Sequence, residues 1–160
     1  MKTQAPRHRQ QARGFTLVEA LVALVVLSIG MLGIAALYVE SLRAGRTALV
    51  RSVAVNLASD MADRIRANRA GGVAYEKDAA DAGVLDADCE QAGASASCTP
   101  AVMADHDKAI WDAEVIRSLP GGTAQIDHDD TTAPDTYTIT VSWTEVGQDA
   151  LVSFVMRIQA

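Results

Sequence analysis

The chain has few of the residues from which metal and redox sites are built. Its 160 residues include two cysteines, three histidines and four prolines. The cysteines, Cys89 and Cys98, are too few for a zinc site of the usual four-ligand kind. They form a reduced pair in a loop if this part of the chain is cytosolic. They form a disulfide if it is exported, because disulfides persist in oxidising compartments.

Basic residues are scarce in the C-terminal half of the chain. Residues 70–160 hold four basic and sixteen acidic side chains, whereas residues 1–14 carry a net charge of +4 and residues 15–69 carry +2. The whole chain has a formal net charge of −6. Phosphate contacts need clustered Lys and Arg, so we expect no nucleic acid among the partners.

The sequence also lacks a recognisable catalytic motif. It contains Ser, His and Asp but neither a nucleophile elbow nor a Cys-His arrangement. The stretches Asp105-His106-Asp107 and Asp127-His128-Asp129-Asp130 contain residue types that bind metals. Adjacent side chains mostly point apart, so we interpret both stretches as solvated turn or cap residues. We expect no metal, no cofactor and no enzymatic activity.

The sequence does contain one long apolar run. From Phe15 to Val39 the only charged residue is Glu19. A helix of this length spans about 37 Å, which is enough to cross the hydrocarbon core of a bilayer. The basic leader over residues 1–14 predicts that the leader stays in the cytoplasm and that the C-terminal part lies on the other side of the membrane.

The charge of Glu19 needs an explanation, because an acid at the centre of a bilayer costs about 2.5–3.5 kcal/mol. One alternative is that Glu19 lies at the interface and reaches water. The other follows from Gly14, which ends the basic leader directly before the apolar run. Cleavage after Gly14 would keep the apolar helix and create an α-amine on Phe15, four residues before Glu19. The two charges could then pair, within one chain or between neighbours.

Residues 13–32, RGFTLVEALVALVVLSIGML, resemble the N-terminal signal of type IV prepilins. The shared features are a basic leader, Gly, Phe, Thr-Leu, one further residue, Glu and then an apolar helix. The resemblance implies cleavage between Gly14 and Phe15 by the prepilin peptidase and N-methylation of Phe15. It also implies that Glu19 occupies the family's assembly position.

Two further stretches, WDAEVIRSLPGG at 111–122 and YTITVSWTE at 137–145, resemble the minor pilin family PilV, the type IV pilus modification proteins. Major pilins often carry a proline in the apolar helix and a disulfide near the C-terminus, and this chain has neither, which favours a minor subunit. The resemblance implies a subunit that helps prime pilus assembly at the inner membrane and is rare in the finished pilus. Its partners would be other minor and major pilins, the prepilin peptidase and inner-membrane lipid.

Two alternatives to this interpretation stay open. A minor pseudopilin of a type II secretion system would carry the same leader and helix. A membrane-anchored periplasmic enzyme or binding module could share the start by coincidence, and a catalytic pocket within residues 71–160 would favour it.

The helical period continues beyond the apolar run until Ala70-Gly71-Gly72. We therefore predict a leader over 1–14, a transmembrane half of one helix over 15–39, an amphipathic half over 40–70, and a periplasmic head domain over 71–160. The apolar stripe predicted for the amphipathic half comprises Tyr38, Leu42, Leu49, Val53, Leu57, Met61 and Ile65.

The head domain is predicted to combine a loop, a helix and a sheet. Residues 71–104 should form a long loop with a short helix at 76–82. A second helix, capped by Asp105 or Asp107, should run to Leu119 and stop at Pro120-Gly121-Gly122. Alternating residues over 137–144 and 152–158 predict a hairpin, with a third strand at 123–128. The predicted class is α+β: a long N-terminal helix packed on a small antiparallel sheet, the architecture that type IV pilins share.

Overall fold

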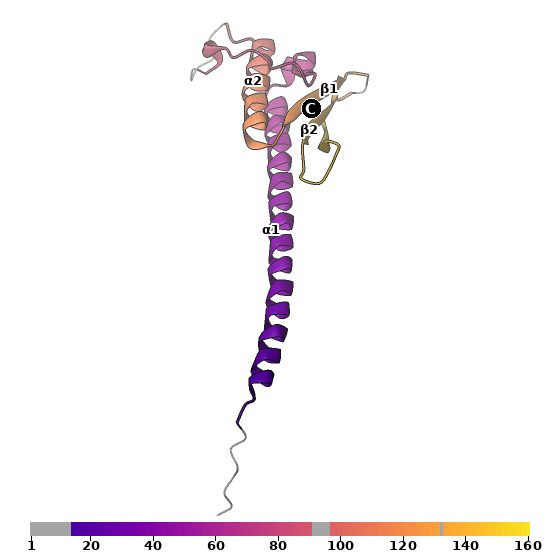
Figure 1. Cartoon of the computed structure of the whole chain (residues 1–160). Coiled ribbons are helices and arrows are strands. Elements are labelled where there is room, and N and C mark those ends of the chain that lie inside the picture. The colour runs from indigo at the N-terminus through magenta and orange to yellow at the C-terminus, as the bar shows by residue number, and fades with distance from the viewer. Residues whose placement is uncertain (1–13, 91–96, 132) are drawn as a thin grey trace, which may run out of the picture. The chain divides into compact units, whose positions relative to one another are not determined.

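The computed structural model describes residues 14–90, 97–131 and 133–160 (Figure 1). Of the predicted leader, only Gly14 is among the described residues. The chain divides into two compact units, Met1–Ala44 and Gly45–Ala160. Helix α1 (Leu17–Ala67) runs through both units.

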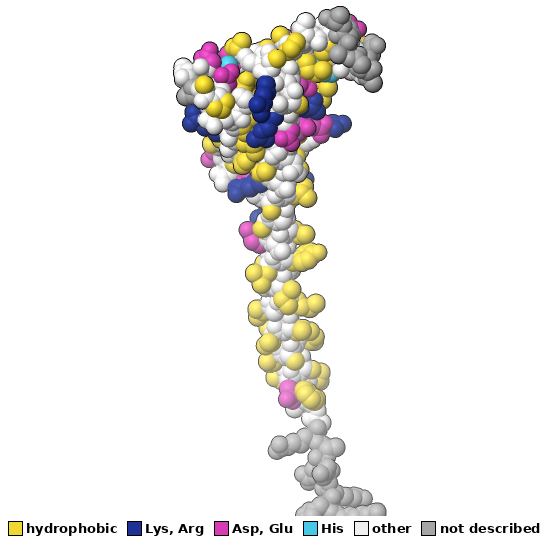
Figure 2. All heavy atoms as spheres, turned by 180° about the vertical axis from the view of Figure 1, so that it is seen from behind, with side chains coloured by type: hydrophobic (Ala, Val, Ile, Leu, Met, Phe, Trp, Pro, Cys, Tyr) yellow, Lys and Arg dark blue, Asp and Glu magenta, His cyan; other side chains and the backbone are white. Residues whose placement is uncertain are grey.

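The N-terminal part of helix α1 is exposed rather than packed in a core. Every residue from 14 to 46 is exposed, and Figure 2 shows hydrophobic side chains along this part of the helix. Among the described residues, α1 is the one helix that is long and apolar enough to cross a membrane. A helix that is apolar all round is stable in lipid or against other helices, because water solvates it poorly.

The head contains a three-stranded antiparallel sheet in the order β1-β2-β3. Its strands are β1 (Thr123–Asp129), β2 (Thr136–Trp143) and β3 (Val152–Gln159). Ile139 of β2 lies opposite Ile126 of β1 and Met156 of β3. The alternation of apolar and polar residues predicted these strands, because alternate side chains of a strand point to opposite faces. The register of the pairs was not predicted.

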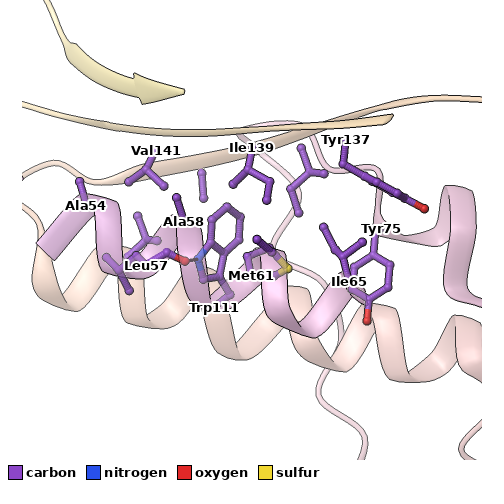
Figure 3. Close-up of a cluster of buried hydrophobic side chains, with 14 of the residues drawn as sticks. Ala54, Leu57, Ala58, Met61, Ile65, Tyr75, Trp111, Tyr137, Ile139 and Val141 are labelled. Atoms are coloured by element: carbon purple, nitrogen blue, oxygen red, sulfur yellow. Dashed lines mark hydrogen bonds between the residues drawn. The ribbon is translucent and has the colours of Figure 1, made fainter. Parts of the chain in front are cut away.

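One face of the sheet packs on the C-terminal part of α1 and on α2 (Pro100–Ser118), as Figure 3 shows. The indole nitrogen of Trp111 donates a hydrogen bond of 2.8 Å to the backbone oxygen of Leu57, which ties α2 to α1. The predicted α+β class is confirmed, and both tryptophans are buried in this core. The side chains that form the centre of this core are Ala54, Leu57, Ala58, Met61, Ile65, Trp111, Val115, Tyr137, Ile139, Val141 and Trp143.

The predicted stripe of α1 is only partly correct. Leu57, Met61 and Ile65 are buried, but Leu49 is 66% exposed. Tyr38 and Leu42 are exposed as well. The helical period of the sequence continues through these residues, whereas burial in the head begins near Val50.

Two predictions for the head are wrong. Helix α2 begins at Pro100 after the cap residue Thr99, whose hydroxyl accepts a hydrogen bond from the amide of Val102. Asp105 and Asp107 therefore lie inside the helix. No helix forms over 76–82, because the backbone of Lys77 exchanges two hydrogen bonds of 2.9 Å with Ile126 of β1. The short helices η1 (Arg69–Tyr75) and η2 (Ala87–Cys89) lie on either side of that segment.

Candidate functional site

The residues predicted to be cleaved and modified lie at the start of α1. Gly14, Phe15 and Thr16 precede the helix, which begins at Leu17, two residues later than predicted. The hydroxyl oxygen of Thr16 accepts a hydrogen bond of 3.2 Å from the backbone amide of Glu19. The backbone oxygen of Thr16 accepts another of 3.2 Å from the amide of Ala20. Thr16 is thus the N-cap of the helix.

The peptide bond between Gly14 and Phe15 is open to solvent. Phe15 is 82% exposed, and a Cβ atom added at Gly14 would meet no other atom within 4 Å. A peptidase can reach this bond without unfolding α1. A side chain at Gly14 would not disturb the fold, so any effect of such a side chain on cleavage would arise in the peptidase.

Glu19 is exposed in the first turn of α1 and forms no salt bridge with a residue that the structure describes. An acidic side chain at this position interacts favourably with the N-terminal end of the helix dipole, by about 0.3–1 kcal/mol at an exposed site. Its carboxylate is therefore available to a cation from elsewhere. The sequence analysis missed Thr16, although Thr-x-x-Glu is the capping-box pattern of a helix N-terminus.

Comparison with known proteins relates this segment to a family. Residues 9–35 match the family model described as the prokaryotic N-terminal methylation motif, and residues 36–109 match the one described as type IV pilin Tt1218. The chain belongs to the type IV pilin superfamily. The second match extends through η1, η2 and the first half of α2. No curated protein and no solved structure was found to match this pilin.

Family membership explains why the apolar part of α1 is exposed. Type IV pilins are in general structural subunits without catalytic activity, and they interact with other pilins. The methylation motif is a feature of pilins that interact with the prepilin peptidase. The apolar part of α1 fits anchoring in a membrane and incorporation into a pilus.

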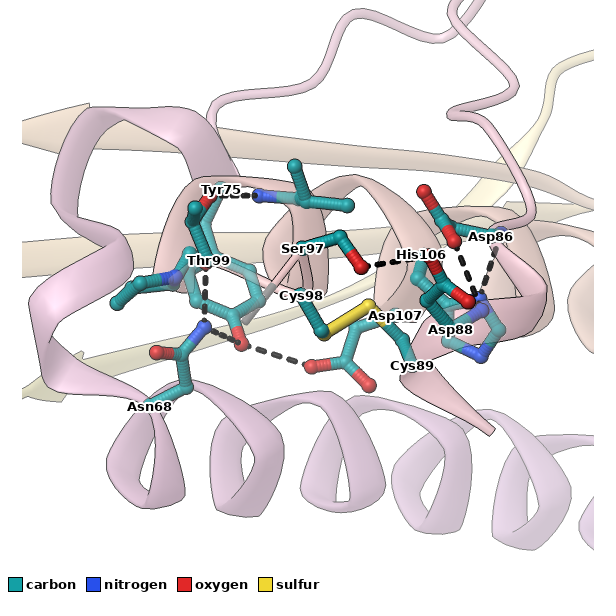
Figure 4. Close-up of a disulfide and its surroundings, with 12 residues drawn as sticks. Asn68, Tyr75, Asp86, Asp88, Cys89, Ser97, Cys98, Thr99, His106 and Asp107 are labelled. Atoms are coloured by element: carbon teal, nitrogen blue, oxygen red, sulfur yellow. Dashed lines mark hydrogen bonds between the residues drawn. A yellow bond between two sulfur atoms is a disulfide. The ribbon is translucent and has the colours of Figure 1, made fainter. Parts of the chain in front are cut away.

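The two cysteines are joined by a disulfide, with Cα atoms 5.2 Å apart (Figure 4). Around it, the hydroxyl of Ser97 donates a hydrogen bond of 2.6 Å to the carboxylate of Asp88. The amide of Asp86 donates one of 2.9 Å to Nδ1 of His106 on α2. The chain just before Cys89 is thus held to α2 through His106.

The interpretation of Asp105-His106-Asp107 as solvated residues is wrong for two of the three. His106 and Asp107 are buried on α2, and Asp107 accepts hydrogen bonds of 2.8 Å from Arg64 and from the hydroxyl of Tyr75. Burial, together with the hydrogen bond to Asp107, raises the pKa of the Tyr75 phenol. The phenol therefore remains a donor at any physiological pH and links η1 to α2.

The second acidic stretch is also not a turn. Asp127, His128 and Asp129 belong to β1, and Nε2 of His128 lies 3.1 Å from a carboxylate oxygen of Asp135. The His128 ring packs against Tyr137 with ring centres 4.7 Å apart. No group of three or more potential metal ligands occurs in the part of the chain that the structure describes.

Lys77 is the most deeply buried cation of the head, with 1% of its surface exposed. Its ammonium lies 2.9 Å from a carboxylate oxygen of Asp112 on α2. It also donates hydrogen bonds to the backbone oxygens of Asp78, Asp81 and Ala124. One ammonium thus links the loop that contains Asp78 and Asp81 to α2 and to β1.

Proposed function

We propose that this chain is a minor type IV pilin, a non-catalytic subunit that helps prime and assemble the pilus at the inner membrane after cleavage by the prepilin peptidase. The observation that carries the proposal is the start of α1. An exposed Gly14-Phe15 bond and a cap at Thr16 directly precede α1, which is exposed and apolar as far as residue 39. Glu19, in the first turn of this helix, forms no salt bridge with a residue that the structure describes.

This geometry supports a role for each of these residues. Cleavage after Gly14 would leave Phe15 as the new N-terminus, the site of N-methylation. The new amine would lie next to Thr16 and four residues before Glu19. In lipid a lone carboxylate is costly, so the Glu19 charge has a use only where a cation joins it. In an assembling fibre that cation is the terminal amine of a neighbouring pilin.

The charge distribution supports an orientation with the head in the periplasm. Residues 1–14 carry +4, which favours retention of the leader in the cytoplasm. The disulfide between Cys89 and Cys98 is compatible with an oxidising compartment around the head. The stretches at 111–122 and 137–145 that resemble type IV pilus modification proteins favour a minor subunit over a major one.

A deletion strain tests the proposed role. We expect loss of the gene to reduce the number of surface pili strongly while type II secretion continues, and expression of the intact chain to restore piliation. Both surface pili and secreted proteins should be measured in the same cultures. Normal piliation with a block in secretion would contradict the proposal and would assign the chain to a secretion system as a pseudopilin.

A further inference from the structure

The two edges of the sheet differ in how they are covered. The edge of β1 that does not pair with β2 is covered at its centre, because Lys77 exchanges two backbone hydrogen bonds with Ile126. Strand β3 pairs with β2 on one side only. Its other edge has no strand beside it among the residues that the structure describes. An open edge of eight residues is long enough to template an additional strand.

The hydrogen-bond pattern shows which backbone groups of β3 point outward. The amide of Ala160 donates to the backbone oxygen of Asp135, and these residues continue the antiparallel register in which Thr136 lies opposite Gln159. Hydrogen-bonded and non-hydrogen-bonded pairs alternate along such a register. The amides and carbonyls at positions 153, 155, 157 and 159 therefore point away from β2, and Val155 lies in the middle of this free edge.

The backbone hydrogen bonds at the β1 edge of the sheet predict the same alternation along β3. Ile126 turns its backbone toward Lys77, so its pair with Ile139 of β2 is a non-hydrogen-bonded one. The backbone of Ile139 then points toward Met156 of β3. The backbone amides and carbonyls of the residues on either side of Met156 therefore point away from β2. The hydrogen bond between Ala160 and Asp135 leads to the same result.

The apolar core is incomplete beside the same edge. Ile139, Val141 and Trp143 of β2 are at most 2% exposed, whereas Val152, Phe154 and Met156 of β3 are only partly buried. Two hollows of about 590 and 280 Å³ lie beside the ends of β3. The smaller one is lined by Arg51, Val55, Trp143, Val152, Ser153 and Phe154, and the larger one by Arg66, Thr136, Arg157, Ile158 and Gln159.

The two hollows differ in charge. At the smaller one, Arg51 is neutralised by two hydrogen bonds to the Glu145 carboxylate, of 2.9 and 3.0 Å. At the larger one, Arg157 is exposed and forms no salt bridge within the described parts of the chain. Asp129 interacts with it electrostatically, but no carboxylate of the described residues lies within salt-bridge distance of it. Its guanidinium can therefore pair with an acidic side chain from outside.

We propose that the free edge of β3 binds an extended segment of another protein as a fourth strand. Main-chain hydrogen bonds to positions 153–159 would hold it, as in other cases of strand addition. Its alternate side chains would be apolar and would fill the hollows against α1. The residue opposite Arg157 would be acidic. This inference concerns the head alone and does not depend on the proposed role in the pilus.

The test uses the full chain in detergent micelles and a labelled octapeptide, acetyl-Thr-Val-Glu-Ile-Thr-Leu-Thr-Val-amide. When this peptide runs antiparallel to β3, its Glu lies opposite Arg157 and its apolar residues face α1. We expect saturable binding by fluorescence anisotropy, and slower amide hydrogen exchange at Ser153, Val155 and Arg157. A peptide with Lys in place of Glu should bind about tenfold more weakly or worse.

The variant Val155→Pro distinguishes strand addition from non-specific binding of the peptide. Proline removes an amide that points outward, so the β2–β3 ladder stays intact while the incoming strand loses a donor and meets the ring. We expect binding to weaken about tenfold or more. The control Val155→Thr keeps the amide and a similar shape and should bind as the unchanged chain does. Circular dichroism checks that both variants fold.

Two outcomes would overturn the proposal. Equal binding of the peptide to the Pro and Thr variants, or no saturable binding to the unchanged chain, would show that the edge is not a strand acceptor. Self-association without peptide that Val155→Pro abolishes would show that a second copy of this chain, and not a different protein, occupies the edge.

Discussion

Glu19→Gln is expected to lower incorporation of this pilin into surface pili by about tenfold or more, while the head unfolds at an unchanged temperature. Glutamine keeps the size of the side chain and removes only the charge. Without the carboxylate, the terminal amine of a neighbour loses its counter-ion in lipid, where an unpaired charge is costly. Immunodetection in sheared pili and crosslinking to partner pilins in the membrane measure the effect.

The structure allows this effect to be separated from a defect in folding. Thr16 caps the helix through the backbone amide of Glu19, so the cap survives any substitution of that side chain. The core of the head lies within Gly45–Ala160, in the other compact unit. Glu19→Asp should restore incorporation in part, because it returns the charge on a shorter arm. If Glu19→Gln assembles and crosslinks like the unchanged pilin, Glu19 has no role in assembly.

Lys77→Met is expected to destabilise the head by about 3–5 kcal/mol, because it leaves a buried carboxylate without its counter-ion. Asp112 is 8% exposed, and its partner ammonium lies 2.9 Å away. For a head of this size the loss corresponds to a fall in the melting temperature of about 10–20 °C. Thermal unfolding of the full chain in micelles, followed by circular dichroism, measures it.

Lys108→Met is the matched control. Lys108 is 5% exposed, but its partners Asp105 and Asp81 have side chains 49% and 48% exposed and can be hydrated once the ammonium is removed. We expect a clearly smaller loss of stability in this variant. In the double variant Lys77→Met/Asp112→Leu no buried charge is left unpaired, so much of the loss should be recovered. A drop for Lys108→Met as large as that for Lys77→Met would contradict this account.

Patterns that depend on neighbours in the sequence predicted much of the fold. The apolar run gave α1, because it is long and lacks proline and glycine-rich breaks as far as Val39. Alternation gave β2 with Tyr137 and Trp143 on the buried face. The start of α2 was missed, although Thr99-Pro100 is a cap followed by a proline at the first helical position, which is a favourable start. The two acids that were preferred as caps are helical.

The buried charges could not be predicted in this way. Lys77, Asp107 and Asp112 are charged residues of an acidic segment. Their burial depends on ion-pair partners that lie 35 or more residues away in the sequence and belong to other elements of the fold. The pairing of Lys77 with Ile126 joins a loop to a strand 49 positions later, and it prevented the short helix predicted at 76–82. The N-terminal site is different, because Gly14, Phe15 and Glu19 are close together in the sequence and lie at a helix end that local residues define.

The mass of the N-terminal peptide of the membrane-extracted protein tests the central claim most directly. The account predicts an N-terminus at Phe15 carrying one additional methyl group in a strain with active prepilin peptidase. Gly14→Leu should keep the leader and Gly14→Ala should still be cut in part, because the peptidase needs a small residue at the cut. A Cβ atom at Gly14 meets no other atom within 4 Å, so the effect of Gly14→Ala does not arise from the fold. An intact Met1 terminus in the unchanged protein, in a strain where other prepilins are processed, would contradict the account.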